Sequence, residues 1–557
     1  MAVLLTASGC QDFLDTKIDT FQTDSTIMTQ RGTLFSYATA FYTPLRSGFT
    51  ALDGNLFAAV TDEAQQTVIG GNALTFNLGI MSSKSVPEYL YKNYYEGIRA
   101  ANNFLTFAAA NKGLLTLYRD TVADKINYKT DTLNYNWYMA EAHIARAFYY
   151  AELIKRYGGV PIVEKTLEQT KADSIYLRRA TYEQVVDYIV SEIDNNKANL
   201  QRNWKTSAYA TSEGRFSLGS ALAIKTRVLL YAASPLHNPT NDPAKWKRAA
   251  AAAYELYTTT GLGYTLDTNY GNYFIGVATS TSAETIFAVR GGASNSIEKA
   301  NYPIATPGGS SGVCPTQNLV DAYEYIGAVN HSNPYANRDP RLAASIVFNG
   351  STWNDRVINQ AAGGKDDQSI TNTSKTGYYL KKFLTDKVNL VQNATVQHHW
   401  PVYRYGEFLL EYAEIMNEVC GPDGTTFDYN GTTYTLTLSA KAALKKVRDR
   451  ASASLPAITT TDPVAFRDVV KHERQVELAF EDHRYWDLLR WKDAMTILNQ
   501  PVKGVKVTNT GTDIAPVFSY QVVDVAKRSF RNANYLYPFA YSDIVLSNNV
   551  LEQNEGY

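Results

Sequence analysis

The densest run of chemically active side chains lies between His472 and Lys492. His472 and Glu473 begin it like the zinc-protease motif His-Glu-x-x-His, but Val476 stands where the second histidine ligand must lie. The acids and bases that follow alternate in sign at spacings of three and four, which is typical of ion pairs along packed helices. They are Glu473, Arg474, Glu477, Glu481, Arg484, Asp487, Arg490 and Lys492. We therefore interpret this run as structural rather than catalytic.

Other catalytic and metal-binding motifs are missing from the sequence. It has no Gly-rich phosphate loop ending in Lys-Ser or Lys-Thr and no Gly-x-Ser-x-Gly nucleophile elbow. Seven histidines, and three cysteines without metal-type spacing, predict no metal site. A pair of glycosidase carboxylates could still lie among the 54 acidic residues, so a helical glycoside hydrolase stays an alternative.

The charge balance and the aromatic content narrow the class of partner. The 557 residues hold 53 Lys and Arg against 54 Asp and Glu, and this formal net charge of −1 predicts no nucleic-acid binding. Tyrosine, at 40 residues, dominates an aromatic content of 12%. Its ring either packs in half-exposed places or stacks on flat ligand faces such as those of sugars. The sequence contains no run of about 18 apolar residues, so it predicts no membrane-spanning helix.

The first ten residues resemble the end of a bacterial lipoprotein signal. Apolar residues 2–5 lead to small residues at 7–9, and Cys10 follows directly. A signal peptidase needs small side chains before its cleavage site, and the thiol of such a cysteine receives a lipid. We therefore expect residues 1–9 to be a residual signal and Cys10 to be a lipidated mature N-terminus, held at a membrane by its acyl chains.

The hydrophobic pattern predicts helices at both ends of the chain. From Ala140 the apolar residues recur at steps of three and four until Gly158-Gly159 ends the helix. Thr181 and Gln184 form the sequence of a capping box at the start of the next helix. Residues 218–233 and 243–257 predict a helix pair of the tetratricopeptide type. Further helices are predicted at residues 88–110, 406–419, 439–451 and 464–499, the last with a break near Asp482.

Residues 261–403 lose this periodicity and become rich in Gly, Asn, Ser, Thr and Pro. A loop-rich region of this length inside a compact protein is usually functional. Two hairpins are predicted elsewhere: one turns at Asn430-Gly431, and the other joins residues 505–507 to 517–523. We expect a single domain over residues 10–557, with the helical scaffold mainly at 88–260 and 404–499.

Several motifs follow one another in a characteristic order. They are residues 145–150 with 157–161, the segment Arg338-Asp339-Pro340-Arg341-Leu342, residues 411–414, residues 447–451, the block from Glu473 to Trp491, and the ending Gln553 to Tyr557. In number and order they resemble the SusD/RagB family, the surface lipoproteins of Bacteroidetes that capture nutrients beside a TonB-dependent transporter. The resemblance runs nearly end to end, and the block at 473–491 is its most specific part. The chain departs from the family at Tyr91, where members often have a tryptophan.

The resemblance implies an all-α, SusD-like fold: four tetratricopeptide-type helix pairs form the scaffold, and a loop-rich ligand-binding region and small β-hairpins complete it. It implies a binding protein that is not an enzyme and has no cofactor. Such a protein binds poly- or oligosaccharide at the cell surface and delivers it to a SusC-like TonB-dependent transporter, held at the outer membrane by lipid on Cys10. A peptide-binding, RagB-like protein of the same fold is the alternative.

Saccharide binding requires aromatic faces for the apolar sides of pyranose rings and polar side chains for the hydroxyls. We expect such residues on irregular segments of the chain. The candidate ligand-binding residues are Asp62, Asn72 and Asn77 in an N-terminal loop, Tyr91 at the position where the family often has tryptophan, and Tyr270, Tyr273, Tyr302, Tyr325, Tyr335 and Trp353 in or beside the loop-rich centre.

Overall fold

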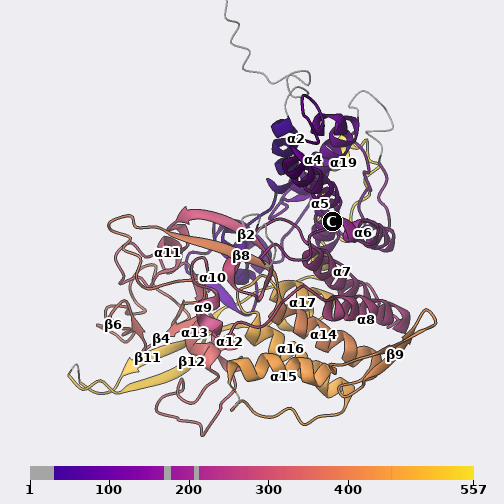
Figure 1. Ribbon diagram of the computed structural model, residues 1–557. Helices are drawn as coiled ribbons and strands as arrows, with labels where there is room; N and C mark the ends of the chain where they lie inside the picture. Colours follow the sequence, from indigo (N-terminus) through magenta and orange to yellow (C-terminus); the bar gives the residue numbers. More distant parts are fainter. Residues whose placement is uncertain (1–30, 168–176, 206–212, 453, 513) are drawn as a thin grey trace, which may run out of the picture.

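A stack of helices forms the scaffold of the protein (Figure 1). The computed structural model describes residues 31–167, 177–205, 213–452, 454–512 and 514–557. Each of the helices α4 to α8 packs against the next in the chain, α14 then packs on α8, and α15 and α16 pack on α14. Their bounds are α4 Tyr91–Ala110, α5 Lys125–Tyr157, α6 Tyr182–Asn196, α7 Leu218–Ala233, α8 Pro243–Thr258, α14 Tyr405–Cys420, α15 Ala440–Ala451 and α16 Pro463–Glu477. The prediction of a mostly helical protein built on paired helices is confirmed.

Local sequence signals set where these helices begin. The Thr181 hydroxyl accepts from the Gln184 backbone N–H at 3.2 Å, and the Gln184 side chain accepts from the Thr181 N–H at 2.8 Å, which confirms the predicted capping box at α6. Asp242 caps α8 through the Ala244 N–H, one residue after the proline at the first helical position. These caps satisfy backbone donors that have no partner within the helix.

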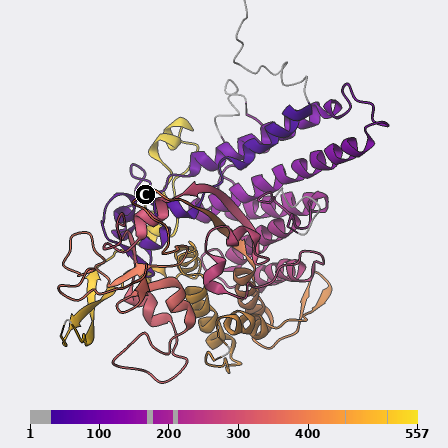
Figure 2. The same cartoon turned by 60° about the vertical axis from the view of Figure 1, so that its left-hand side comes forward.

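Helix α5 begins earlier than its apolar pattern predicts. The expected start was Ala140, whereas the helix runs from Lys125. In its first part only Tyr135 and Trp137 are buried, so residues 125–139 carry no apolar stripe that periodicity could reveal. This polar extension makes α5 and the preceding α4 a long hairpin that projects from the body, as Figure 2 shows.

A glycine allows the two helices of this hairpin to approach closely. A Cβ atom on Gly97 of α4 would lie 2.4 Å from a ring carbon of Tyr149 on α5. The Tyr149 ring is fully buried, and its hydroxyl donates to the Phe41 carbonyl at 2.7 Å. The side chain at position 97 therefore has to be absent for the pair to pack as it does.

The loop-rich centre is held to the scaffold by one long sheet. Strand β2 (Thr285–Ser294) pairs antiparallel with β8 (Val396–Arg404), so that the two ends of the region 261–403 lie side by side. Short elements fill the interval: α9 Tyr270–Tyr273, α10 Ala278–Thr281, α11 Ser296–Asn301, β3 Val313–Pro315, α12 Gln317–Ala322, α13 Pro340–Ser345, β4 Ile346–Phe348, β5 Thr352–Trp353, β6 Arg356–Val357 and β7 Tyr378–Leu380. The sequence predicted loops here and missed the β2–β8 pair.

Both predicted hairpins are confirmed. Strands β9 (Thr426–Tyr429) and β10 (Thr432–Thr435) flank Asn430-Gly431, both of which have positive φ, as a primed turn requires. Strands β11 (Val502–Asn509) and β12 (Phe518–Ala526) pair with Val505 opposite Val522.

The remaining elements border the scaffold. They are α2 Arg31–Ala38, β1 Ala64–Gln66, α3 Gly71–Asn77, α17 Arg484–Arg490, α18 Ala494–Ile497 and α19 Tyr541–Leu546. None of the helices in the described ranges combines the length and hydropathy that crossing a bilayer would need. Cys10 and the expected residual signal at 1–9 lie outside the described residues.

Candidate functional site

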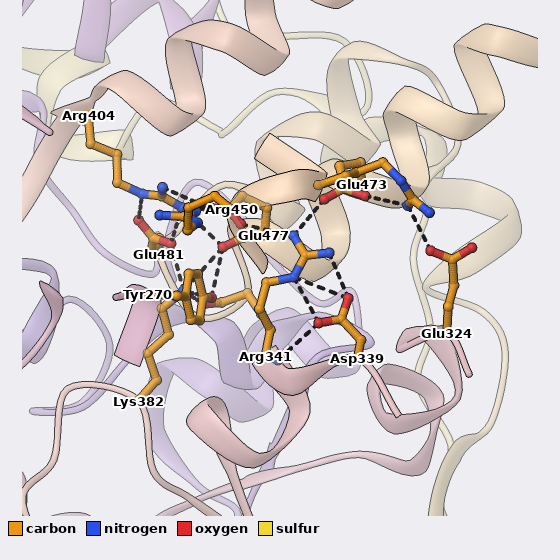
Figure 3. A network of polar contacts seen from close by, with 12 residues as sticks. Tyr270, Glu324, Asp339, Arg341, Lys382, Arg404, Arg450, Glu473, Glu477 and Glu481 are labelled. Atoms are coloured by element: carbon orange, nitrogen blue, oxygen red, sulfur yellow. Dashed lines mark hydrogen bonds and ion pairs between the residues drawn. The ribbon is translucent and has the colours of Figure 1, made fainter. Parts of the chain in front are cut away.

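A buried network of ion pairs joins the loop-rich centre to the helical scaffold (Figure 3). At its middle, the Glu477 carboxylate at the end of α16 accepts from Arg404 at 2.7 Å, from Arg341 at 2.9 Å and from Arg450. Burial alone would raise the pKa of Glu477, but Arg450, Arg404 and Arg341 together hold it well below its ordinary value. Glu477 is therefore ionised and saturated with donors.

The flanking acids of the same helix end are paired in the same way. Glu473 accepts from Arg341 at 2.5 Å and from Arg448 at 2.8 Å. Glu481 accepts from Arg404 at 2.6 Å and from Lys382 at 2.7 Å. A glycosidase needs one carboxyl group that gives up a proton and a second that acts as base or nucleophile. These carboxylates are instead fixed by guanidinium groups, so the ion pairs that the run predicted are present.

Most partners of this run come from distant parts of the chain, which the sequence spacing did not reveal. Arg474 binds Asp487 at 2.8 Å, and Arg490 binds Asp487 at 2.9 Å, but Arg490 also binds Glu414 on α14 at 2.5 Å. Only the Asp487–Arg490 pair has the three-residue spacing that predicted contacts along one helix. The expected ion pairs are present, but most of them link different elements.

Tyr270, a candidate ligand-binding residue, belongs to the ion network. Its hydroxyl donates to the backbone carbonyl of Glu477 at 2.9 Å and accepts from the Lys382 ammonium at 2.7 Å. Burial lowers the pKa of Lys382 to about 8, although Glu481 opposes this shift. The Tyr270 ring is buried beneath this ammonium and offers no face to a ligand.

The other aromatic candidates of the centre are mostly packing residues. Tyr273, Tyr302, Tyr335 and Trp353 are all buried. The rings of Tyr302 and Trp353 meet edge to face with their centroids 5.2 Å apart. The Tyr335 ring stacks on that of Phe348 with a centroid separation of 4.2 Å. The structure therefore corrects the expectation of an open stacking platform at these residues. A region with few helices still needs an apolar core, and its aromatic rings supply it.

Tyr325 is the one aromatic candidate of the centre whose side chain is half-exposed. The Arg338 guanidinium lies 4.4 Å from its ring centroid and also donates to its hydroxyl at 3.3 Å. One face of the ring is thereby occupied by the protein itself. Tyr325 stays a candidate through its other face.

The polar candidates of the N-terminal loop hold that loop in place. Asp62 binds Arg484 on α17 at 2.8 Å. The Asn72 side chain donates to Asp53 at 3.0 Å, and the buried Asn77 side chain donates to the Ala59 carbonyl at 3.4 Å. These contacts satisfy part of each side chain within the protein, so only Asn72 and, to a small extent, Asp62 keep access to solvent.

Tyr91 is half-buried among other aromatic rings and is close in the chain to the exposed Tyr89. The centroid of the Tyr91 ring lies 4.8 Å from that of Tyr95, 5.4 Å from that of Tyr157 and 5.5 Å from that of Phe539. Two residues earlier, Tyr89 is 37% exposed and its hydroxyl donates to Asp543 on α19. Tyr541, on the same short helix, is 57% exposed. We call Tyr89, Tyr91, Tyr541 and Asp543 the tyrosine surface.

Sequence reasoning found Tyr91 but missed Tyr89 and Tyr541. The Tyr541 backbone N–H donates to the Ser83 carbonyl at 2.8 Å, so residues more than 450 positions apart in the chain lie together here. Local sequence carries no sign of that contact. All seven tryptophans, by contrast, are buried, so exposed tyrosine is the available stacking residue in the described part of the chain.

A groove of about 440 Å³ lies on the helical scaffold, between α6, α7, α8 and the β9–β10 hairpin. Tyr254, Tyr429 and Tyr434 line it together with charged side chains. The Lys225 ammonium bridges Asp194 at 2.7 Å and Glu255 at 3.0 Å. The charge of Lys225 in the groove is thus already balanced, and the three tyrosines that line the groove are only half-buried.

No group of three or more His, Cys, Asp or Glu side chains within the described ranges is arranged to hold a metal ion. Cys314 is buried, and burial raises the pKa of its thiol to about 11. This thiol is therefore protonated and unreactive at neutral pH.

Comparison with known proteins gives the family. The model described as the SusD family matches residues 283–557, and the model described as "Starch-binding associating with outer membrane" matches residues 12–230. The chain belongs to the SusD family. The resemblance drawn from the sequence motifs is thereby confirmed, and neither description names a catalytic activity.

Individual relatives of the SusD family agree with this result. The SusD-like protein P38 of Formosa agariphila is 22% identical over 66% of this chain and 69% of its own length. A crystal structure of a SusD-like protein from Bacteroides fragilis superposes with a TM-score of 0.76 at 23% identity, covering 97% of this chain and 99% of the other. A SusD-like carbohydrate-binding protein from the same organism gives 0.73 at 21% identity, covering 94% and 99%. These likenesses show the SusD fold.

Proposed function

We propose that this SusD-family protein binds poly- or oligosaccharide at the cell surface, without chemistry, and delivers it to a SusC-like TonB-dependent transporter in the outer membrane. The observation that carries the proposal is the pair of family matches, which together span most of the chain, one of them to a family described as starch-binding and associated with the outer membrane. The ion network supports binding over hydrolysis, because its carboxylates are held by arginine and lysine side chains.

The tyrosine surface is the ligand platform in this proposal. The rings of Tyr89 and Tyr541 are exposed, as stacking on a pyranose ring requires. The Asp543 carboxylate accepts from Tyr89, and part of its hydrogen-bonding capacity remains for sugar hydroxyls. Tyr91 is the half-buried member of this surface: its ring packs on Phe539, and burial raises the pKa of its hydroxyl well above the usual range. Tyr91 thus contributes as a ring that positions its neighbours.

The groove on the scaffold is the surface that we assign to the transporter. Tyrosine and arginine side chains in a concave site are typical of the residues that dominate protein interfaces, and Tyr254, Tyr434 and Arg248 lie in this groove. Lipid on Cys10 would keep the protein beside its partner, so a weak contact is sufficient once both are in one membrane.

Binding to a panel of soluble neutral polysaccharides and oligosaccharides tests the proposal. We expect the wild-type chain to bind at least one glycan, and Tyr89→Ala and Tyr541→Ala each to weaken that binding roughly tenfold, the loss of one stacked ring. Tyr118→Ala is the matched control, because Tyr118 is an exposed tyrosine far from this surface in the fold. Thermal unfolding of each variant separates lost contacts from lost folding.

The results that contradict the proposal are distinct. A wild-type chain that captures peptides but no glycan would favour the RagB-like alternative. Turnover of a glycan, abolished by replacing one carboxylate, would establish a hydrolase. Glycan binding that survives both tyrosine substitutions would move the ligand platform elsewhere, with Tyr325 as the next candidate.

A further inference from the structure

The turn between α4 and α5 presents three large apolar side chains to solvent. Helix α4 ends at Ala110, a short 3-10 helix covers Lys112–Leu115, and α5 begins at Lys125. In a stretch of nine residues at this turn, the side chains of Tyr118, Val122 and Ile126 are 94%, 84% and 82% exposed. We call this turn the α4–α5 tip. Single exposed apolar residues are ordinary, but here three lie close together in the chain at the end of the hairpin that projects from the body in Figure 2. We call these three residues the apolar patch.

The tip is a well-bonded structure that keeps these side chains outside. The Arg119 guanidinium donates to Asp124 at 2.7 Å and to the Leu115 carbonyl at 3.2 Å, and it pairs with Asp131 at 2.9 Å. The Asp120 carboxylate accepts from the Val122 and Ala123 backbone N–H groups at 2.9 and 3.0 Å. These bonds satisfy the polar groups of the turn locally. The apolar side chains are therefore directed away from the core by the turn itself.

The charges around the tip are arranged for a negatively charged surface. Lys112, Lys125 and Lys129 are exposed there. Arg119 pairs with both Asp124 and Asp131, and Asp120 accepts from backbone N–H groups, so the four cations Lys112, Arg119, Lys125 and Lys129 outnumber these three acids by one. Exposed lysines beside a tyrosine and aliphatic side chains match the boundary of a bilayer, where ammonium groups reach lipid phosphates and tyrosine lies at the headgroup level.

The chain from Cys10 joins the folded body at this same tip. Helix α2 begins at Arg31 and packs beside Lys112–Leu115. Hydrogen bonds from Arg119 and Asn127 lower the pKa of Asp124, and the charge of Arg31 adds to that effect, which places Arg31 near the turn. Cys10 lies 21 positions before Arg31 in the sequence. A lipid on Cys10 would therefore tether the body by the end that carries the apolar patch.

We propose that the α4–α5 tip inserts into the headgroup layer of the bilayer that holds the lipid anchor, with Val122 and Ile126 among the acyl chains and the lysines on the lipid phosphates. This inference rests on the lipid-anchored location in the proposed function. The acyl chains on Cys10 hold the protein at the membrane. The tip adds orientation, because it fixes which side of the helical scaffold faces the membrane.

Flotation with lipid vesicles tests the proposal on the full chain carrying Cys10→Ala, so that no acyl group contributes. We expect this chain to float with vesicles of phosphatidylcholine and phosphatidylglycerol, and less well with phosphatidylcholine alone. Val122→Asp and Ile126→Asp should each lower vesicle affinity at least about tenfold. Val391→Asp is the matched control, because Val391 is 75% exposed on another part of the surface, and it should leave flotation unchanged.

A spectroscopic measurement reports on the depth of the tip. All seven native tryptophans are buried, so Tyr118→Trp adds one exposed indole. We expect bromine-labelled lipids to quench the added emission of this variant and to leave the wild-type emission nearly unchanged.

Several results would overturn the proposal. One is failure of the Cys10→Ala chain to float with anionic vesicles at low salt. Another is an equal loss of flotation in Val122→Asp and Val391→Asp. A Val122→Asp variant that floats normally but loses its transporter complex, or its self-association, would make the tip a protein contact. Glycan binding is measured on the same proteins, so a chain that floats but binds no glycan refutes the proposed ligand and leaves the membrane contact standing.

Discussion

Replacing Glu477 by glutamine tests whether charge balance holds the ion network of Figure 3 together. The substitution keeps the size of the side chain and removes one negative charge at a fully buried position. Three arginines lose a charged acceptor: Arg404, Arg341 and Arg450. An amide nitrogen would also face a guanidinium group, where donor meets donor.

The magnitude follows from the partners that remain. Breaking a buried ion pair by removing one member costs about 3–5 kcal/mol, because a buried charge is left uncompensated. Arg404 keeps Glu481 and Glu284, Arg341 keeps Asp339 and Glu473, and Arg450 keeps Glu284. Since every guanidinium retains at least one carboxylate, we expect a loss in the free energy of unfolding of about 3 kcal/mol. For a cooperative chain of this size, that lowers Tm by about 2 to 3 °C.

Urea unfolding followed by tryptophan fluorescence measures this loss. The control is Asp449→Asn, which breaks the exposed Lys445–Asp449 pair on α15 and should cost at most about 0.5 kcal/mol. If Glu477→Gln costs no more than this surface substitution, the network does not depend on its central charge and the reasoning is refuted.

Three further changes probe helix contacts, a helix cap and a buried acid. Gly97→Ala should destabilise the protein by about 1–3 kcal/mol in urea unfolding, because the new Cβ would overlap the Tyr149 ring; an unchanged midpoint would show that the helices can separate freely. Thr181→Ala should cost about 1 kcal/mol by the same assay, whereas Thr181→Ser should be nearly neutral, since the hydroxyl that caps Gln184 is retained. Burial raises the pKa of Asp482 to about 8, so folding must protonate an acid that is ionised in the unfolded chain above about pH 4. The Tm advantage of Asp482→Asn over wild type should accordingly grow between pH 4 and pH 8 and then level off, and a constant difference across that range would contradict the shifted pKa.

The scaffold could be predicted from the sequence because its signals are local. Apolar residues at steps of three and four, and caps such as Thr181 with Gln184, act within one or two helical turns. Helix α7 accordingly has the predicted bounds, Leu218–Ala233. The same reasoning failed for the first half of α5, because residues 125–139 are held by the hairpin with α4 and carry no apolar stripe.

The fate of the aromatic candidates could not be predicted, because a ring is buried or exposed by partners far away in the chain. Tyr270 meets Glu477 across 207 positions, and Tyr302 meets Thr385 across 83. Tyr541 stays exposed on a helix that docks beside Ser83. All three residues are tyrosines, so residue type does not distinguish them, and the tertiary contacts separate a packing residue from a surface residue.

The loop-rich centre has a structural role that its composition did not reveal. Arg341 and Lys382, both in the centre, reach Glu477 at the end of α16 and Glu481 just after it, and the β2–β8 sheet joins the two sides of the region. Because these charges are buried, the centre cannot separate from the scaffold without exposing several unpaired ions at once. Its aromatic rings fill its own core. A region fixed in this way is suited to hold the scaffold rigid, while the exposed tyrosines, the groove and the apolar tip lie on the scaffold helices and the segments that border them. A rigid body with separate surfaces for ligand, transporter and membrane can be oriented by its attachment without changing shape. Substitutions at Tyr541, at Tyr254 and at Val122 should therefore affect glycan binding, transporter binding and membrane binding independently of one another.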